Sequence, residues 1–294
     1  MSIFKKKTTL IHHITYMGVM AAVNLLFIVL DTYTQFMMLL LVFLLPFTST
    51  VVSYYCLKRY YPIYAVASIG LCLIFNPTGT IFYVVPALIT GFLIGLFLEK
   101  GVNPFWIVLC STIIETGLSF AFISLINFIG KTDVINSIFL TVGLGGFEFK
   151  THLVFLVIYF MALVQCSLTH FVLFTDIKKI GIEVNTGINT FAPYIIGLLV
   201  SLIISLVFAL TYEPLSLLFI AIAMYFGVFL FANIIVKAHK LSYILMTVFI
   251  VISFFGFALL YKKVSAPLGI WFVSFFPLSI AITSFVDNYL LKGK

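Results

Sequence analysis

The residue of this chain that most clearly could do chemistry is Glu115, a carboxylic acid near the middle of the apolar stretch 104–129. A charged side chain at the centre of a membrane costs about 3 kcal/mol even on lenient insertion scales. Ser111 and Ser119 lie four residues to either side of it, which would give a helix here one polar face. We expect Glu115 to face the interior of a helical bundle, and to be neutral unless a cation or a hydrogen-bond donor compensates it.

Two explanations of Glu115 remain open. It could form a structural hydrogen bond between helices, as polar residues in membrane spans do. It could instead be a ligand or proton site, for which Gln165 in the apolar stretch 151–174 would supply a donor at similar depth. The sequence therefore predicts a substrate-binding group of Glu115, Ser111, Ser119 and Gln165.

Three further polar positions fall together on what we predict to be the outer side. Asp31 follows the first apolar stretch, Asn76 opens the segment NPTGT (76–80), and Glu148 ends the glycine-rich string VGLGGFE. Asn-Pro followed by Gly is ordinary turn chemistry, so a turn alone explains Asn76. The glycine-rich string lacks the phosphate-binding patterns and indicates a loop. Position alone adds Asp31, Asn76 and Glu148 to the candidate substrate-binding residues.

Catalytic and metal-binding patterns are absent from the sequence. It has no H-E-x-x-H, no G-x-S-x-G and no nucleotide-binding G-x-x-x-x-G-K-[ST]. Its four cysteines all fall within apolar stretches and form no C-x-x-C pair, so neither a disulfide framework nor a metal site is expected. The sequence predicts a protein that is not an enzyme and holds no cofactor.

Composition indicates the elements that must position these residues. Hydrophobic residues make up 63% of the chain and charged residues 9%, and the charges lie between long apolar stretches. A stretch of about 20 apolar residues crosses a bilayer as a helix. We predict an all-α, polytopic transmembrane bundle of about ten helices. The stretches are 12–30, 36–57, 60–75, 80–98, 104–129, 151–174, 190–211, 214–236, 241–261 and 267–290.

The basic residues predict that both termini are cytoplasmic, because Lys and Arg in short loops stay on that side. Of the 16 basic residues, 12 would be inside and 4 outside. The inner set is Lys5, Lys6, Lys7, Lys58, Arg59, Lys100, Lys178, Lys179, Lys237, Lys240, Lys292 and Lys294; the outer set is Lys131, Lys150, Lys262 and Lys263. The net charge of +7 then fits contact with anionic lipid and not with nucleic acid.

Two long loops suggest how the chain is divided. One spans about 130–150 and the other about 175–189. We place a boundary in the second, which gives a six-helix membrane domain (1–182) and an additional four-helix membrane region (183–294).

Two ladders of small residues are spaced so that helices can pack closely against them. Ala87, Gly91 and Gly95 form one, for which packing inside the chain is favoured. Gly18 and Ala22 form the other, for which packing inside the chain and docking against a partner protein are both open.

Several short motifs within about residues 10–175 have a counterpart in a known family. They are TYMGVMAA (15–22), LPF (45–47), NPTG (76–79) and PA (86–87) followed by Gly91, Gly95 and EK (99–100). In these the chain resembles the YybS-like family of bacterial membrane proteins. That family is itself similar to the substrate-binding S-components of energy-coupling-factor (ECF) transporters.

The resemblance implies a six-helix fold that captures a vitamin-like micronutrient from outside. A separate transmembrane coupling protein and two ATPases would drive uptake. Gly18 and Ala22 would then form the docking face, and the loops around Asp31, Asn76 and 143–148 would close the pocket. The chain exceeds such a fold by about 110 residues and four helices.

Three functions therefore stand as hypotheses, all in a bacterial cytoplasmic membrane. The first is a substrate-binding subunit of an importer energised by separate coupling and ATPase subunits. The second is an autonomous secondary transporter that uses Glu115 as a proton site. The third is a membrane scaffold or lipid-handling protein in which Glu115 is structural.

Overall fold

A computed structural model describes residues 9–34, 38–131, 133, 150–179, 191–237, 248 and 266–286. These residues are almost entirely helical and form no strand, so the all-α prediction is confirmed for the part described. The α-helices are α1 (Leu10–Thr34), α2 (Met38–Tyr55), α3 (Tyr61–Phe75), α4 (Pro77–Gly79), α5 (Val85–Glu99), α6 (Pro104–Gly130), α8 (Lys150–Lys179), α9 (Phe191–Ala209), α10 (Glu213–Lys237) and α12 (Ala266–Phe285).

Six helical spans of the described part are long and apolar enough to cross a membrane. They are Leu10–Tyr33, Pro77–Glu99, Pro104–Gly130, Val154–Phe171, Ala192–Ala209 and Glu213–Ala232. These spans indicate a multi-pass membrane protein. A helix occupies each stretch predicted from the sequence except 241–261, of which the structure describes only residue 248. Among these helices α3 has 15 residues and is too short to count as a span by the same measure.

The chain forms two compact units. The first comprises Met1–Thr132 and Met161–Gly187, and the second comprises Asp133–Phe160 and Ile188–Lys294. Helix α8 therefore belongs to the second unit up to Phe160 and to the first from Met161. The boundary predicted between residues 182 and 183 lies outside the described residues.

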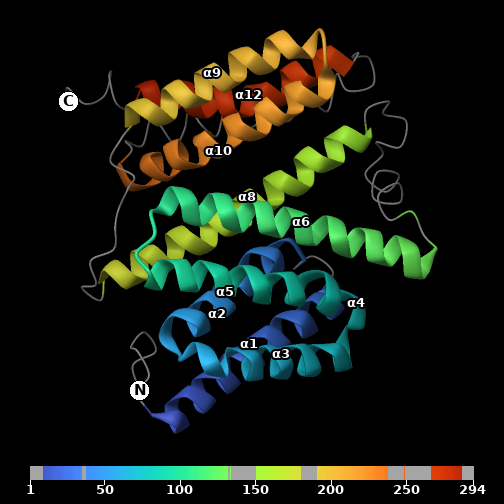
Figure 1. Cartoon of the computed structure of the whole chain (residues 1–294), viewed down its shortest axis with the longest axis vertical. Coiled ribbons are helices and arrows are strands. Elements are labelled where there is room, and N and C mark those ends of the chain that lie inside the picture. The colour runs from blue at the N-terminus through green and yellow to red at the C-terminus, as the bar shows by residue number, and fades with distance from the viewer. Residues whose placement is uncertain are drawn as a thin grey trace. The chain divides into compact units, whose positions relative to one another are not determined.

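Close packing of α2 against α5 forms the centre of the first unit, with α1 against α2 and α3, and α6 against α5 (Figure 1). The glycines of α5 make this approach possible. A Cβ atom on Gly91 would lie 2.4 Å from the Ser49 Cβ, and one on Gly95 would lie 2.6 Å from the Ser53 Cβ. This ladder therefore packs inside the chain, as its spacing favoured.

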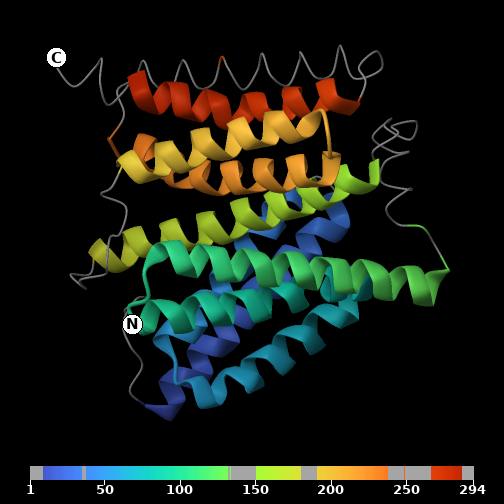
Figure 2. The ribbon, with the colours of Figure 1, turned by 45° about the horizontal axis from the view of Figure 1, so that its top comes forward.

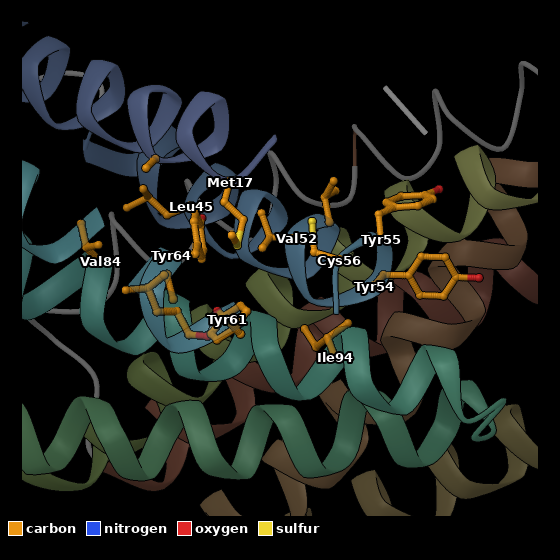
Figure 3. Close-up of a cluster of buried hydrophobic side chains, with 14 of the residues drawn as sticks. Met17, Leu45, Val52, Tyr54, Tyr55, Cys56, Tyr61, Tyr64, Val84 and Ile94 are labelled. Atoms are coloured by element: carbon orange, nitrogen blue, oxygen red, sulfur yellow. Dashed lines mark hydrogen bonds between the residues drawn. The ribbon is translucent and has the colours of Figure 1, made fainter. Parts of the chain in front are cut away.

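Aromatic side chains fill much of the core between these helices. Figure 3 shows Val84 and Tyr55 at opposite ends of the cluster, with Tyr61 and Tyr64 between them. The Tyr61 and Tyr64 ring centroids are 5.5 Å apart in a tilted, edge-on arrangement. The Tyr61 hydroxyl donates to the backbone oxygen of Leu88 at 2.6 Å. Such bonds satisfy tyrosine hydroxyls away from water.

The turn from α5 to α6 fixes the register of the two helices that carry the candidate site. Gly101 adopts a left-handed conformation (φ +66°), which ends α5 at low cost for a residue without Cβ. Asn103 then caps α6, because its side-chain oxygen accepts from the Phe105 N–H at 2.9 Å, and Pro104 follows at the first helical position. The end of α5 is also tied by Glu99, whose carboxylate lies 2.7 Å from the Lys58 Nζ.

A π-helical segment, η2 (Thr80–Val84), separates α4 from α5. Pro86, just beyond it, has no N–H to donate and its ring crowds the carbonyl four residues earlier. Membrane helices accommodate such prolines by local widening of this kind. The result is one continuous helical span, Pro77–Glu99, whose parts before and after the π-helical segment have different registers.

The second unit is built mainly from α9, α10 and α12, which contact one another (Figure 2). The α9–α10 pair is joined near its turn by Ser205 and Ser216, whose hydroxyl oxygens are 3.0 Å apart. The rings of Tyr194 and Phe229 stack with centroids 5.1 Å apart. Small hydroxyls and stacked rings of this type hold apolar helices together in lipid.

Candidate functional site

Glu115 is buried between α6 and α5, with 5% of its surface exposed. Its carboxylate accepts a hydrogen bond from the hydroxyl of Thr90, which is fully buried on α5. The short turn between α5 and α6 makes the two helices neighbours, so the pairing follows from local topology. The expectation that Glu115 faces the interior is met in the first unit.

Two hydroxyls on the same face of α6 are buried beside this carboxylate. Ser111 and Thr112 are both fully buried, and neither hydroxyl forms a hydrogen bond within the described residues. Thr116, by contrast, donates to the backbone oxygen of Thr112 at 2.8 Å. We refer to Thr90, Ser111, Thr112 and Glu115 as the Glu115 cluster. A buried hydroxyl left without a partner costs about 1–3 kcal/mol, so two of them in one cluster require an explanation.

Helix α8 brings Cys166 to the same place. This fully buried residue lies near enough to Glu115 and Thr112 for both side chains to act on its thiol, although the Thr112 contact does not have hydrogen-bond geometry. The cysteine forms no disulfide. Its position beside Glu115 had no signal in the sequence.

The other residues predicted for this group have different surroundings. Gln165 is buried on α8, but within the described part the hydrogen bond to Glu115 comes from Thr90 and not from Gln165. Ser119 is half-buried one turn after Glu115. Sequence reasoning missed Thr90, because a threonine within an apolar stretch is common and its partner lies 25 positions away.

No basic residue balances Glu115 in the part of the chain that is described. The segments 77–98, 104–130 and 154–171, which supply the neighbouring helices, contain no Lys or Arg. The ion pair between Lys58 and Glu99 lies at the end of α5. In a low-dielectric interior a carboxylate attracts positive charge strongly, so the cluster favours a cation or a proton.

A second polar cluster is buried between α1, α2 and α3, and sequence reasoning missed it. The Asn24 side-chain nitrogen donates to the Tyr64 hydroxyl at 2.9 Å and to the Ser68 hydroxyl at 3.4 Å. The Thr48 hydroxyl donates to the Asn24 side-chain oxygen at 2.6 Å. We refer to these four residues as the Asn24 cluster. Its one available signal was Asn24 itself, an amide in the middle of an apolar stretch.

Of the three positions predicted to lie on the outer side, the structure brings Asp31 and Asn76 to the same end of the first unit. Asn76 caps α4, because its side-chain oxygen accepts from the Gly79 N–H at 2.7 Å, and its nitrogen donates to the Thr32 hydroxyl at 3.4 Å. Asp31, adjacent to Thr32, lies near enough to Tyr83 to act on its hydroxyl electrostatically. The structure thus places Asp31 and Asn76 at the same end of the first unit. Glu148 and the string 142–148 lie outside the described residues.

The two small-residue ladders differ in whether another helix of the described chain packs against them. Gly18 and Ala22 are exposed on α1, and no atom lies within 4 Å of a Cβ built on Gly18. Within the described residues this face of α1 is therefore open. The described residues also contain no group of three or more His, Cys, Asp or Glu side chains placed to hold a metal ion.

No known protein family, curated protein or solved structure matches the chain. Its function must therefore be inferred from the chemistry of the polar clusters and of the open face on α1.

Proposed function

We propose that this protein is the membrane-embedded substrate-binding subunit of an importer for a small, polar, vitamin-like micronutrient. Separate coupling and ATPase subunits supply the energy. In this proposal the chain crosses the bacterial cytoplasmic membrane about ten times, with both termini in the cytoplasm. The resemblance of residues 10–175 to the YybS-like family and to ECF S-components belongs to the same proposal.

The observation that carries the proposal is the incomplete Glu115 cluster. An interior carboxylate with one protein donor, beside the unpartnered hydroxyls of Ser111 and Thr112, is costly to maintain in an apolar core. Binding sites in membrane proteins are built from such interior polar groups. A solute that bonds to these three side chains would offset the cost, which gives the cluster a reason to exist.

The open face of α1 supports the requirement for a partner subunit. Gly18 and Ala22 let another helix approach closely, and the chain itself leaves this face uncovered within the described residues. The sequence contains no nucleotide-binding G-x-x-x-x-G-K-[ST] pattern, so energy from ATP would have to come from other chains.

Affinity purification of the tagged full chain from its native membrane tests the proposal. We expect an ATPase and a coupling subunit to co-purify with the wild type, and both to be lost from the double variant Gly18→Leu, Ala22→Leu. Gly70→Leu is the matched control, because Gly70 on α3 is equally exposed with no atom within 4 Å of a built Cβ. Absence of both subunits from the wild type at any level contradicts the proposal.

A second function, an autonomous proton-coupled transporter, is favoured by one observation. Glu115 has no Lys or Arg partner among the described residues, and an intramembrane carboxyl group without a fixed counter-charge can gain and lose a proton. Reconstitution of the protein alone into liposomes distinguishes this function. Uptake of a radiolabelled solute mixture driven by a pH gradient, lost in Glu115→Gln, supports the transporter. A wild type that is inactive without other subunits supports the importer.

A further inference from the structure

The chemical balance of the Glu115 cluster indicates the charge of what it binds. Its four side chains offer one carboxylate and three hydroxyl oxygens. Thr90 donates to the carboxylate, and no Lys or Arg is present in the helical segments around it. The cluster therefore has oxygen acceptors in excess and lacks a positive charge.

The two unpartnered hydroxyls strengthen this conclusion. Thr116 shows that a hydroxyl on α6 can donate to the helix backbone one turn earlier, at 2.8 Å. Ser111 and Thr112 are fully buried and do not do so in the described structure. Each hydroxyl oxygen keeps lone pairs with which it can bind a cation.

The kind of cation follows from the ligand atoms. Carboxylate and hydroxyl oxygens are hard ligands, which do not favour the transition metals that prefer imidazole or thiolate. The cluster contains a single carboxylate, which balances one positive charge, so an alkali or ammonium ion fits better than a divalent ion. No group of three or more His, Cys, Asp or Glu side chains occurs among the described residues to hold such a metal.

We propose that the Glu115 cluster binds a monovalent cation, with the Glu115 carboxylate as counter-ion and the Thr90, Ser111 and Thr112 hydroxyls as neutral ligands. The cation is an alkali ion or the ammonium group of an organic solute. This inference rests on the proposed function, because it assigns a positive charge to the solute, or to the ion that accompanies it.

Labelling of Glu115 with a hydrophobic carbodiimide tests the inference on the wild-type full chain. The reagent attacks protonated carboxyl groups in apolar surroundings, and a cation bound to the carboxylate excludes the proton. The labelling rate of the peptide that contains Glu115 is followed by mass spectrometry in sodium, potassium or methylammonium chloride. Choline chloride keeps the ionic strength constant, and Glu115→Gln confirms the labelled position.

We expect at least one of the three small cations to slow labelling of Glu115. At a concentration about ten times its Kd the slowing should be about tenfold, since only the unoccupied fraction reacts. Protection by sodium or potassium identifies an inorganic ion, and protection by methylammonium alone identifies an ammonium group. Thr90→Val should weaken the protection. Thr116→Val is the matched control and should retain it, because the Thr116 hydroxyl is already bonded to the backbone.

Equal labelling rates in all four salts would overturn the inference and make Glu115 a proton site or a structural residue. The proposed function fails separately. If a cation protects Glu115 but no coupling or ATPase subunit co-purifies, the cation site is supported and the importer is contradicted. If the subunits co-purify but no cation protects Glu115, the importer is supported and the cation site is contradicted.

Discussion

The Asn24 cluster and the Glu115 cluster lie in the same unit and use similar side chains, but they differ in how completely they are hydrogen-bonded. Asn24 is 1% exposed, and both ends of its amide bond to neighbours on α2 and α3. Glu115 is 5% exposed and accepts from Thr90, while two hydroxyls on its own face have no hydrogen-bond partner in the described part.

This difference in hydrogen bonding indicates which cluster has a structural role and which has a binding role. A fully bonded polar network fixes which helix faces meet, because any other packing would leave its members without partners in an apolar interior. A partly bonded cluster lowers stability and is retained where a ligand completes it. We therefore interpret the Asn24 cluster as structural and the Glu115 cluster as a binding site.

The largest expected effect comes from Gly91, which lies where α2 meets α5 and so supports both clusters. In Gly91→Ala the new Cβ would collide with the Ser49 Cβ and, at 2.6 Å, with the backbone oxygen of Pro46. We expect the free energy of unfolding to fall by about 3 kcal/mol, the upper range for overpacking. Reversible unfolding of the detergent-solubilised protein measures it. Gly18→Ala is the control and should not lower stability, because no atom lies within 4 Å of the new Cβ and alanine is the better helix former; equal losses in the two variants contradict the packing described.

Removal of Asn24 should have the next largest effect. Asn24→Ala leaves the Tyr64 and Thr48 hydroxyls without this partner, and we expect a loss of about 2 kcal/mol in the free energy of unfolding. The same unfolding measurement checks it. Ser68→Ala removes the longest bond of the cluster, 3.4 Å, and should cost less than about 0.5 kcal/mol. A negligible effect of Asn24→Ala would remove the structural role from this cluster.

Glu115→Gln should change stability less than Asn24→Ala does. The glutamine keeps an acceptor for Thr90 and differs from a protonated Glu115 by one neutral group, so we expect a change of less than about 1 kcal/mol in either direction. Unfolding of the ligand-free protein in detergent is the appropriate measurement. A loss as large as that of Asn24→Ala would place Glu115 among the structural residues.

The last prediction makes the same substitution, Thr to Val, once in each cluster. Thr48→Val removes a hydroxyl that donates to Asn24 at 2.6 Å and should cost about 1 kcal/mol. Thr112→Val removes a buried hydroxyl that has no hydrogen bond in the described structure, so it should cost nothing and should raise the free energy of unfolding by about 1 kcal/mol. Equal costs for the two variants would show that the Thr112 hydroxyl has a partner after all.

Apolar stretches were enough to predict the longer helices that the structure describes. Helix α6 begins at Pro104, as predicted, because the apolar stretch 104–129 begins there. The interior position of Glu115 was predictable for the same reason: a carboxylate in an apolar stretch has one tolerable location. The sequence did not determine the number of membrane crossings. Helix α3 has 15 residues, which is too few to cross the hydrocarbon core of a bilayer.

Pairings between helices could not be predicted from the sequence. Thr90 on α5 meets Glu115 on α6, and Asn24 on α1 meets Thr48 on α2 and Tyr64 on α3, in each case across a contact between separate helices. The spacing of the glycines of α5 indicated a close contact but not its partner. Serine and threonine occur throughout the apolar stretches, so their identity alone does not show which of them are hydrogen-bonded.

Native mass spectrometry of the full chain, gently extracted from its own membrane, tests most directly whether the Glu115 cluster is the binding site. We predict a bound small molecule on the wild type and on Ser68→Ala, and none on Glu115→Gln. The same bound mass on Glu115→Gln, or no bound molecule on any of the three proteins, would contradict the account.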